Sequence, residues 1–185
     1  QTEEYASRFI QLGCRPDRVI VTGSLKYDTA QVADKVDGAD SLAAQLGLDN
    51  GKLWVAGGTG NDEEKIILDV YKKLKEQFSE LRLAIVPRKP ERFDEVAQLI
   101  TQNGLPLIRY SQVKNQIQEK TSIEHRASSI DSVILGDTMG DLRKFYSLAD
   151  LIFVGRSLVP MGGSDMMEAA ALGKCTIFGP YAFNF

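Results

Sequence analysis

Short apolar runs recur along the chain, and glycine, proline or aspartate borders each of them. The runs are 18–23 (RVIVTG), 52–57 (KLWVAG), 81–86 (LRLAIV), 106–110 (PLIRY), 132–137 (SVILGD), 150–155 (DLIFVG) and 175–179 (CTIFG). They are too short for typical helices and rich in β-branched residues, which indicates strands. Continuous apolar character is typical of strands that are buried on both faces. We therefore predict a buried strand at each run.

Helical patterns fill most of the intervals between these runs. The segment 61–78 places one apolar stripe along a helix: Ile67, Val70, Tyr71, Leu74 and Phe78. Acidic residues open this segment and lysines close it, which offsets the helix dipole. A second helix is predicted at 91–103, between Pro90 and Gly104. Two shorter helices are predicted at 139–150 and 164–173.

Alternating strands and helices predict the fold class. The pattern is typical of an α/β, Rossmann-like, mostly parallel sheet with helices on both faces. The polar stretch 111–131 interrupts the alternation and contains the single histidine, His125. We expect this stretch to be a solvated excursion with one short helix, and His125 to lie on the surface.

Composition narrows the possible classes of protein. The chain has 185 residues, 43% of them hydrophobic, which suffices for one sizeable core. The net charge of −3 argues against a nucleic-acid partner, because duplex binders normally carry a basic surplus. Cys14 and Cys175 lie far apart and form no metal-spaced pair, so we expect buried thiols in a reducing cytoplasm and no metal site. No apolar run reaches the ~18 residues of a membrane span.

Four strand-to-helix junctions lie where ligands bind in open α/β sheets. The Gly-rich stretch 56–64 lacks a P-loop lysine, and its acidic residues favour a tight, capped turn over a phosphate site. Arg88 follows a strand between prolines, which suits bidentate binding of a phosphate or a carboxylate, although a plain surface arginine fits as well. In 135–142, Gly136 allows a flat ligand close approach, whereas Asp137 or Thr138 can simply cap a helix.

The fourth junction is 160–175, PMGGSDMMEAAALGKC. Asp165 and Glu168 fit a capping box, or Ser164 is the cap, and Gly173 is a natural helix stop. The functional alternative is that Gly162 and Gly163 let backbone N–H groups approach a phosphate at the helix start. Glu168 would then accept hydrogen bonds from ribose hydroxyls. Both interpretations remain open on these residues alone.

Six motifs occur in an order that resembles a known family: VTGSLKYD, VAGGTGNDEE, VPRKPERF, LGDTMGDL, FVGRSLVPMGGSDMMEAAALGK and FGPYAFNF. From Thr2 to Phe185 the chain resembles the C-terminal half of 3-deoxy-D-manno-octulosonic acid (Kdo) transferases of lipopolysaccharide biosynthesis. The resemblance implies a GT-B architecture, in which two Rossmann-like domains face each other across a cleft. It also implies transfer of Kdo from CMP-Kdo to a lipid A precursor, with inversion and without a metal or other cofactor.

The resemblance further implies roles for individual residues. Arg88 would meet the nucleotide phosphate, and the backbone around Gly136, Thr138 and Met139 would flank the cytosine. Gly163, Ser164 and Asp165 would form the phosphate-side helix start, and Glu168 would bind the ribose. The sequence departs from the usual family pattern at several of these motifs. Ser164-Asp165 replaces His-Asn, Lys89 replaces His, GTG at 58–60 replaces STH, and Arg156 replaces Gly.

The expected organisation and activity follow from this resemblance. We expect residues 1–23 to be the tail of a missing N-terminal half with its linker, and 24–185 to be a nucleotide-sugar-binding domain truncated at its C-terminus. The missing half would carry the general base, the acceptor site and a membrane-anchoring segment. The full-length protein would lie at the cytoplasmic face of the inner membrane, whereas this fragment would be soluble, inactive and without a catalytic residue. Two alternatives remain, namely a GT-B transferase or epimerase that uses a UDP sugar, and a non-catalytic nucleotide-binding or interaction domain.

Overall fold

The computed structural model describes residues 1–24, 32–33, 35–48, 51–118 and 131–183. It divides into two compact units, 1–31 and 32–185, which we describe separately. The first unit contains helix α1 (Glu3–Gln11) and the 3-10 turn η1 (Pro16–Arg18). The assignment of residues 1–23 to a missing half stays a prediction.

The strand predicted at 18–23 does not form. The residues after Arg18 pair with none of the described strands, and Ile20 is 81% exposed. An isolated extended segment lacks the backbone partner that makes a strand stable. The apolar residues at 18–23 therefore do not mark a strand, because this segment has no neighbouring strand among the described residues.

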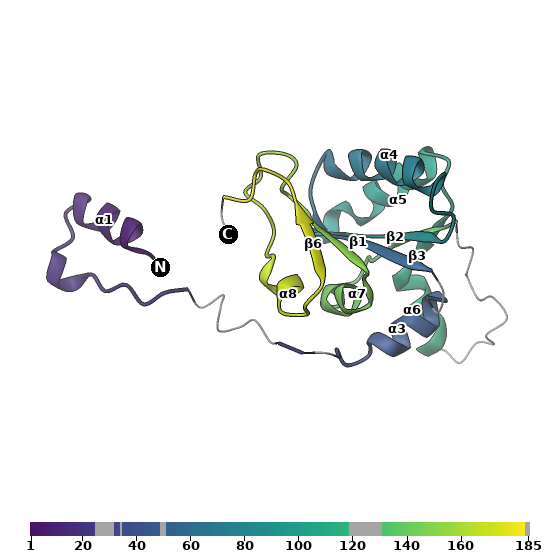
Figure 1. Ribbon diagram of the computed structural model, residues 1–185, viewed down its shortest axis with the longest axis horizontal. Helices are drawn as coiled ribbons and strands as arrows, with labels where there is room; N and C mark the ends of the chain where they lie inside the picture. The colour runs from purple at the N-terminus through teal and green to yellow at the C-terminus, as the bar shows by residue number, and fades with distance from the viewer. Residues whose placement is uncertain (25–31, 34, 49–50, 119–130, 184–185) are drawn as a thin grey trace. The chain divides into compact units, whose positions relative to one another are not determined.

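The second unit is built on a six-stranded sheet in which every pair of neighbours is parallel (Figure 1). Its strands are β1 (Lys52–Thr59), β2 (Leu81–Pro87), β3 (Leu107–Arg109), β4 (Val133–Leu135), β5 (Leu151–Val154) and β6 (Cys175–Phe178). Their order across the sheet is β3-β4-β2-β1-β5-β6. The chain leaves β1 toward β2 on one side and returns to β5 on the other, so the strand order reverses at β1.

Helices cover both faces of this sheet (Figure 1). Helices α4 (Glu63–Lys75) and α5 (Phe93–Gln102) lie on one face, and the 3-10 turn η2 (Pro90–Arg92) leads into α5. The other face carries α3 (Ala39–Leu46), α6 (Tyr110–Gln118), α7 (Leu142–Leu148) and α8 (Met167–Ala170). The predicted fold class is confirmed.

Side chains along each central strand alternate between two apolar clusters. In β1, Val55 packs into the cluster under α3 and α7, whereas Ala56 packs into the cluster under α4 and α5. In β5, Phe153 and Val154 divide in the same way, and all four side chains are almost fully buried. The continuous apolar runs are therefore explained by burial on both faces. The edge strand β6 forms as predicted, but most of its residues are exposed and not buried.

Most of the predicted helices form within their predicted ranges, but one is much shorter than predicted. Helices α4, α5 and α7 lie inside their predicted ranges, whereas α8 starts only at Met167 and ends at Ala170. Helix α3 was not predicted, although its Leu42 and Leu46 are fully buried. Helix α6 is the short helix of the polar stretch, and His125 lies outside the described residues.

Two further expectations concern cysteines and membrane spans. Cys14 and Cys175 are both exposed, so the interpretation as buried thiols is wrong. Cys14 belongs to a unit whose α1 buries no residue, and Cys175 begins the exposed edge strand β6. No helix among the described residues is long and apolar enough to cross a membrane.

Candidate functional site

The carboxyl end of β1 brings two of the predicted site residues together. The Ser164 hydroxyl donates a hydrogen bond of 2.7 Å to the carbonyl of Gly58, and the backbone N–H of Arg88 donates one of 3.0 Å to the carbonyl of Thr59. Gly136, at the end of β4, donates its N–H to Ile85 of β2 at 2.8 Å. The prediction that Arg88, Gly136 and Ser164 lie at one edge of the sheet is confirmed. This edge is where open α/β sheets bind ligands.

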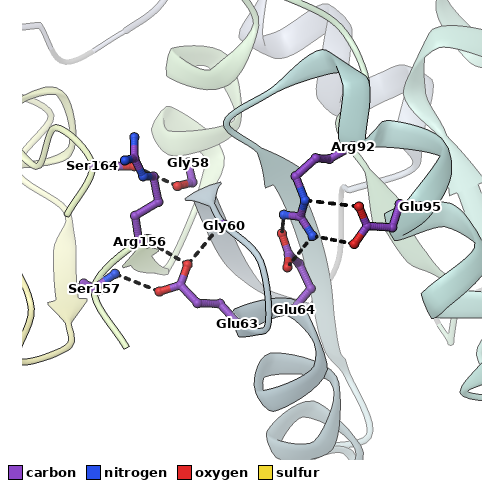
Figure 2. A network of polar contacts seen from close by, with 9 residues as sticks. All are labelled: Gly58, Gly60, Glu63, Glu64, Arg92, Glu95, Arg156, Ser157 and Ser164. Carbon is purple, nitrogen blue, oxygen red and sulfur yellow. Dashed lines mark hydrogen bonds and ion pairs between the residues drawn. The ribbon is translucent and has the colours of Figure 1, made fainter. Parts of the chain in front are cut away.

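A buried carboxylate, Glu63, ties together the loops that follow β1 and β5 (Figure 2). One of its oxygens accepts from the N–H groups of Gly60 and Arg156, and the other accepts from Ser157 at 2.7 Å and Leu158 at 2.9 Å. Glu63 is fully buried, so no solvent replaces these contacts. The sequence pattern predicted for it only a place in a capped first turn. Its partners after β5 lie more than 90 residues away in the chain, so no local signal predicts them.

A second buried ion-pair network stands beside the first (Figure 2). The Arg92 guanidinium donates to both oxygens of Glu64, at 2.6 and 3.2 Å, and also to Glu95 at 3.0 Å. Burial lowers the pKa of Arg92, but the hydrogen bonds to Glu64 and Glu95 outweigh it and raise the pKa above its ordinary value. Two carboxylates thus neutralise Arg92, and this side chain is bound within the protein.

An open pocket of about 410 Å³ lies between these two networks. Its wall includes Thr59 at the end of β1 and the following Gly60, Arg88 after β2, and Arg156 and Met161 after β5. Residues from η2 and the start of α5 close another side, where Lys89, just before η2, faces Glu91 at 3.8 Å. Neither Arg88 nor Arg156 forms an ion pair with a carboxylate in the part of the chain that the structure describes. The pocket wall therefore carries two arginines without an ion-pair partner among the described residues.

At the end of β4, Gly136 is closely packed, whereas Met139 is exposed. A Cβ at Gly136 would lie 2.8 Å from Val86 Cγ2 and 3.0 Å from a Phe145 ring carbon, so only glycine fits. The Thr138 hydroxyl donates to Asp141 at 2.6 Å, and neither residue's side chain caps α7. Met139 is 64% exposed at the tip of this turn.

Asp137 also differs from its predicted role as a cap of α7. Its carboxylate accepts from the Ser111 N–H at 2.8 Å, the Ser111 hydroxyl at 2.7 Å, and Arg109 Nε at 2.7 Å. The carboxylate is therefore turned toward the start of α6. The ends of β3 and β4 are adjacent in the sheet, so Asp137 reaches Ser111 across neighbouring strands.

The glycine pair at 162–163 turns the chain back onto the loop after β5. Gly163 donates its N–H to the carbonyl of Arg156 at 2.8 Å, and Ser164 donates its N–H to Gly155 at 2.9 Å. The N–H of Gly163 is thus used within the protein, so the hypothesis that it faces a phosphate is wrong for Gly163. Both Gly162 and Gly163 have φ near +90°, a conformation that favours glycine. Gly173 has a φ of 64°, but α8 ends at Ala170 with Ala171 as its C-cap, so the helix stops before the predicted glycine.

Helix α8 begins differently from the predicted capping box. Asp165 accepts from the N–H of Met167 at 2.9 Å, and Ser164 is not a cap because its hydroxyl binds Gly58. The Glu168 side chain forms no hydrogen bond with the described residues. Burial, followed by the negative charges of Glu168 and Asp165, raises the pKa of Tyr146. Glu168 is half-buried, and its carboxylate can accept from an external donor because it has no hydrogen-bond partner among the described residues.

Tyr146 itself packs against β1. Its side chain is fully buried, and its hydroxyl has no hydrogen-bond partner among the described residues. A Cβ at Gly57 would overlap both the hydroxyl oxygen and a ring carbon of Tyr146. The absence of a side chain at Gly57 thus lets α7 approach the sheet beside the site.

A solved structure with this architecture decides the family. The C-terminal CMP-Kdo-binding domain of WaaA from Acinetobacter baumannii matches with a TM-score of 0.66 and 34% identity. The match covers 80% of this chain and 71% of that domain. This chain belongs to the Kdo transferase family. The inferred GT-B half-fold agrees with the parallel sheet described above.

Curated proteins also match along nearly the whole chain. The 3-deoxy-D-manno-octulosonic acid transferase of Haemophilus influenzae is 35% identical, over 96% of this chain and 39% of that protein. A bifunctional glycosyltransferase/methyltransferase of Fusobacterium nucleatum is 34% identical, over 100% of this chain and 27% of that protein. The chain thus spans less than half of the length of these relatives. No protein-family model matches it.

The described residues contain no group of three or more histidine, cysteine, aspartate or glutamate side chains that could hold a metal ion.

Of the residues that shape the site, Arg88 and Ser164 were predicted from the sequence, whereas Glu63, Glu64 and Arg92 were missed. Arg156 stood out only as a departure from the family pattern. The φ of Arg156 is 59°, in the left-handed region that favours glycine. The family resemblance implied a glycine at this position.

Proposed function

We propose that this chain is the donor-binding domain of a Kdo transferase and that it holds CMP-Kdo at the carboxyl edge of its sheet. The observation that carries the proposal is the match to a solved CMP-Kdo-binding domain at 34% identity. The pocket at this edge, with its arginines, is consistent with that match. The donor has an anionic phosphate between nucleoside and sugar. Unpaired arginines are suited to that group.

Arg88 is our candidate for the phosphate contact. Its backbone is fixed to Thr59, its side chain is exposed at the pocket, and no carboxylate of the described residues pairs with it. Gly136, Thr138 and the exposed Met139 would flank the cytosine. A methionine side chain adapts well to a flat ring.

The remaining residues would form the wall near α8. Gly163 and Ser164 would act by shape, because their N–H groups are bonded to the loop after β5. Asp165 binds the Met167 N–H, which turns its negative charge toward the protein backbone. Glu168 is the free acceptor that would bind the ribose hydroxyls.

The activity of the whole protein is part of the same proposal. A hydroxyl of a lipid A precursor would attack the anomeric carbon of Kdo, and CMP would leave. We assign no general base to this chain; the base, the acceptor site and attachment to the cytoplasmic face of the inner membrane would belong to the rest of the protein. This domain would position the donor and stabilise the charge on the leaving phosphate, without a metal or further cofactor.

Calorimetric titration of the chain with CMP-Kdo, CMP and UMP tests the proposal. We expect CMP-Kdo and CMP to bind and UMP to bind more weakly, because the turn at 136–139 would recognise the base. Equal affinity for UMP would point to a UDP-sugar enzyme instead. No heat and no change in melting temperature with any nucleotide would favour a non-catalytic domain. We also expect no Kdo transfer by the chain alone.

A further inference from the structure

The backbone of Arg156 is held in a conformation that arginine rarely adopts. Its φ is 59°, and among the non-glycine residues that the structure describes only Asp62 shares a positive φ. Hydrogen bonds hold the chain around this residue: Arg156 donates to Glu63, Gly163 donates to Arg156, and Ser164 donates to Gly155. Non-glycine residues in this region are strained, and such strain gathers at functional sites. The presence of an arginine at this position therefore needs an explanation.

The side chain of Arg156 lies on the pocket wall with most of its donors unused. Its Nη2 donates to the carbonyl of Met161 at 3.2 Å, and this is the single hydrogen bond that its guanidinium forms with the described residues. A Cβ at Gly60 would lie 3.1 Å from Arg156 Cγ and 2.5 Å from Met161 Sδ, so Gly60 makes room for both. A guanidinium has five N–H donors in a planar fork. At least one edge of that fork is available to an anion.

A neighbouring polar atom in the same wall also lacks a partner. Thr59 is fully buried, lines the pocket, and its hydroxyl forms no hydrogen bond with the described residues. A buried hydroxyl without a partner is costly, and a bound ligand would supply one. The wall near Arg156 thus offers both a positive charge and an unsatisfied hydroxyl.

Two arginines of the pocket wall are available to anionic groups of a ligand. Arg92 is paired with Glu64 and Glu95, and Lys89 faces Glu91, whereas Arg88 and Arg156 have no ion-pair partner among the described residues. Kdo is a 2-keto sugar acid, so the anomeric carbon of the nucleotide-linked sugar carries both the phosphate oxygen and a carboxylate. One ligand therefore brings two anions to adjacent positions. Two arginines in one pocket match that arrangement.

We infer that Arg156 binds the carboxylate of the sugar acid while Arg88 binds the phosphate. This inference rests on the proposed function, and it makes Arg156 a specificity-determining residue. It would favour nucleotide-linked sugar acids over nucleotides that carry neutral sugars. Arg suits this task because its planar fork matches a carboxylate with two parallel hydrogen bonds.

The test is a calorimetric comparison of CMP-Kdo and CMP with the natural chain and three variants. Arg156→Gly and Arg156→Asn remove the charge with residues that tolerate the left-handed backbone, so the loop is expected to keep its shape. Lys89→Ala is the matched control, because it removes one exposed positive charge from the same pocket. Both Arg156 variants should bind CMP-Kdo about tenfold or more weakly. Their CMP affinity should stay within about twofold of the natural value, and Lys89→Ala should affect the two ligands equally.

Each other outcome has a distinct meaning. Equal losses for CMP and CMP-Kdo, or no loss for either, would overturn the carboxylate assignment while leaving the proposed function intact. A natural chain that binds neither ligand would overturn the proposed function and the inference with it. A second measurement, Arg88→Ala, separates the two arginines, because it should weaken CMP and CMP-Kdo alike.

Discussion

Replacing Glu63 by glutamine should destabilise the domain far more than its small change in shape implies. Each oxygen of the Glu63 carboxylate accepts two backbone N–H groups, one pair from Gly60 and Arg156 and one from Ser157 and Leu158. Glutamine has one oxygen and one NH₂ group, which only donates. Either orientation of the amide therefore points a donor at two backbone donors. Because the site is fully buried, water cannot rescue them.

The magnitude follows from the two N–H groups that lose their acceptor. A buried donor without a partner costs about 1–3 kcal/mol, so two cost about 2–6 kcal/mol. That loss is a large share of the ~5–15 kcal/mol by which domains are stable. The matched control is Glu91→Gln, whose side chain is 67% exposed and faces Lys89 at 3.8 Å. An exposed pair of this kind contributes about 0–1 kcal/mol.

Urea unfolding followed by circular dichroism measures both variants. We expect a lower midpoint for Glu63→Gln with an unchanged slope, and almost no shift for Glu91→Gln. CMP affinity should also fall for Glu63→Gln, because Gly60 and Arg156 line the pocket. If Glu63→Gln lost no more stability than the control, the carboxylate would not be what fastens the two loops.

Three further predictions concern single side chains. Arg88→Ala should weaken CMP binding about 10- to 150-fold, since a hydrogen bond to a charged group contributes ~1.5–3 kcal/mol; titration with cytidine should show little change, and an equal loss would deny the phosphate contact. Glu168→Gln should weaken CMP about tenfold without lowering the melting temperature, as Glu168 forms no hydrogen bond with the described residues, and unchanged affinity would exclude its ribose role. Burial raises the pKa of Asp141, but hydrogen bonds from Lys114, Lys144 and Thr138 outweigh it and lower that pKa from 3.8 to about 2. A carboxyl group whose pKa is lower in the folded state stabilises the fold at pH values above its ordinary pKa. The free energy of unfolding should therefore fall by about 2 kcal/mol as the pH is lowered from about 4 to 2. Asp141→Asn should flatten that part of the unfolding curve, and an equally steep curve for the variant would contradict the assignment.

The sheet was predictable from the sequence because burial leaves a local mark. The runs 83–86 and 151–154 are apolar at successive residues, as strands buried on both faces require. The run 18–23 carries the same mark and still forms no strand among the described residues, because pairing depends on a partner that the pattern cannot reveal. Helix α3 was missed because its eight residues bury few side chains and carry no strong stripe.

The candidate site was only partly predictable because its contacts join distant segments. Arg88 was found through its flanking prolines, which are local. Ser164, by contrast, seemed to be a helix cap, whereas its hydroxyl binds Gly58, 106 residues earlier. Glu63 seemed to be an ordinary acidic residue of a first turn, and its long-range partners lie after β5. A polar residue at a helix start has the same local pattern in both roles.

The contact between Gly57 and Tyr146 restricts the order in which this domain can change during evolution. A methyl group at position 57 would collide with the tyrosine ring and hydroxyl, which already occupy the space that it needs. Loss of the hydroxyl alone, as in Tyr146→Phe, leaves a ring carbon equally close. A larger residue at position 57 is therefore accessible only after the aromatic ring at position 146 has been replaced by a smaller side chain. The two positions should vary as a pair, and the first step of any such path must leave a cavity under α7.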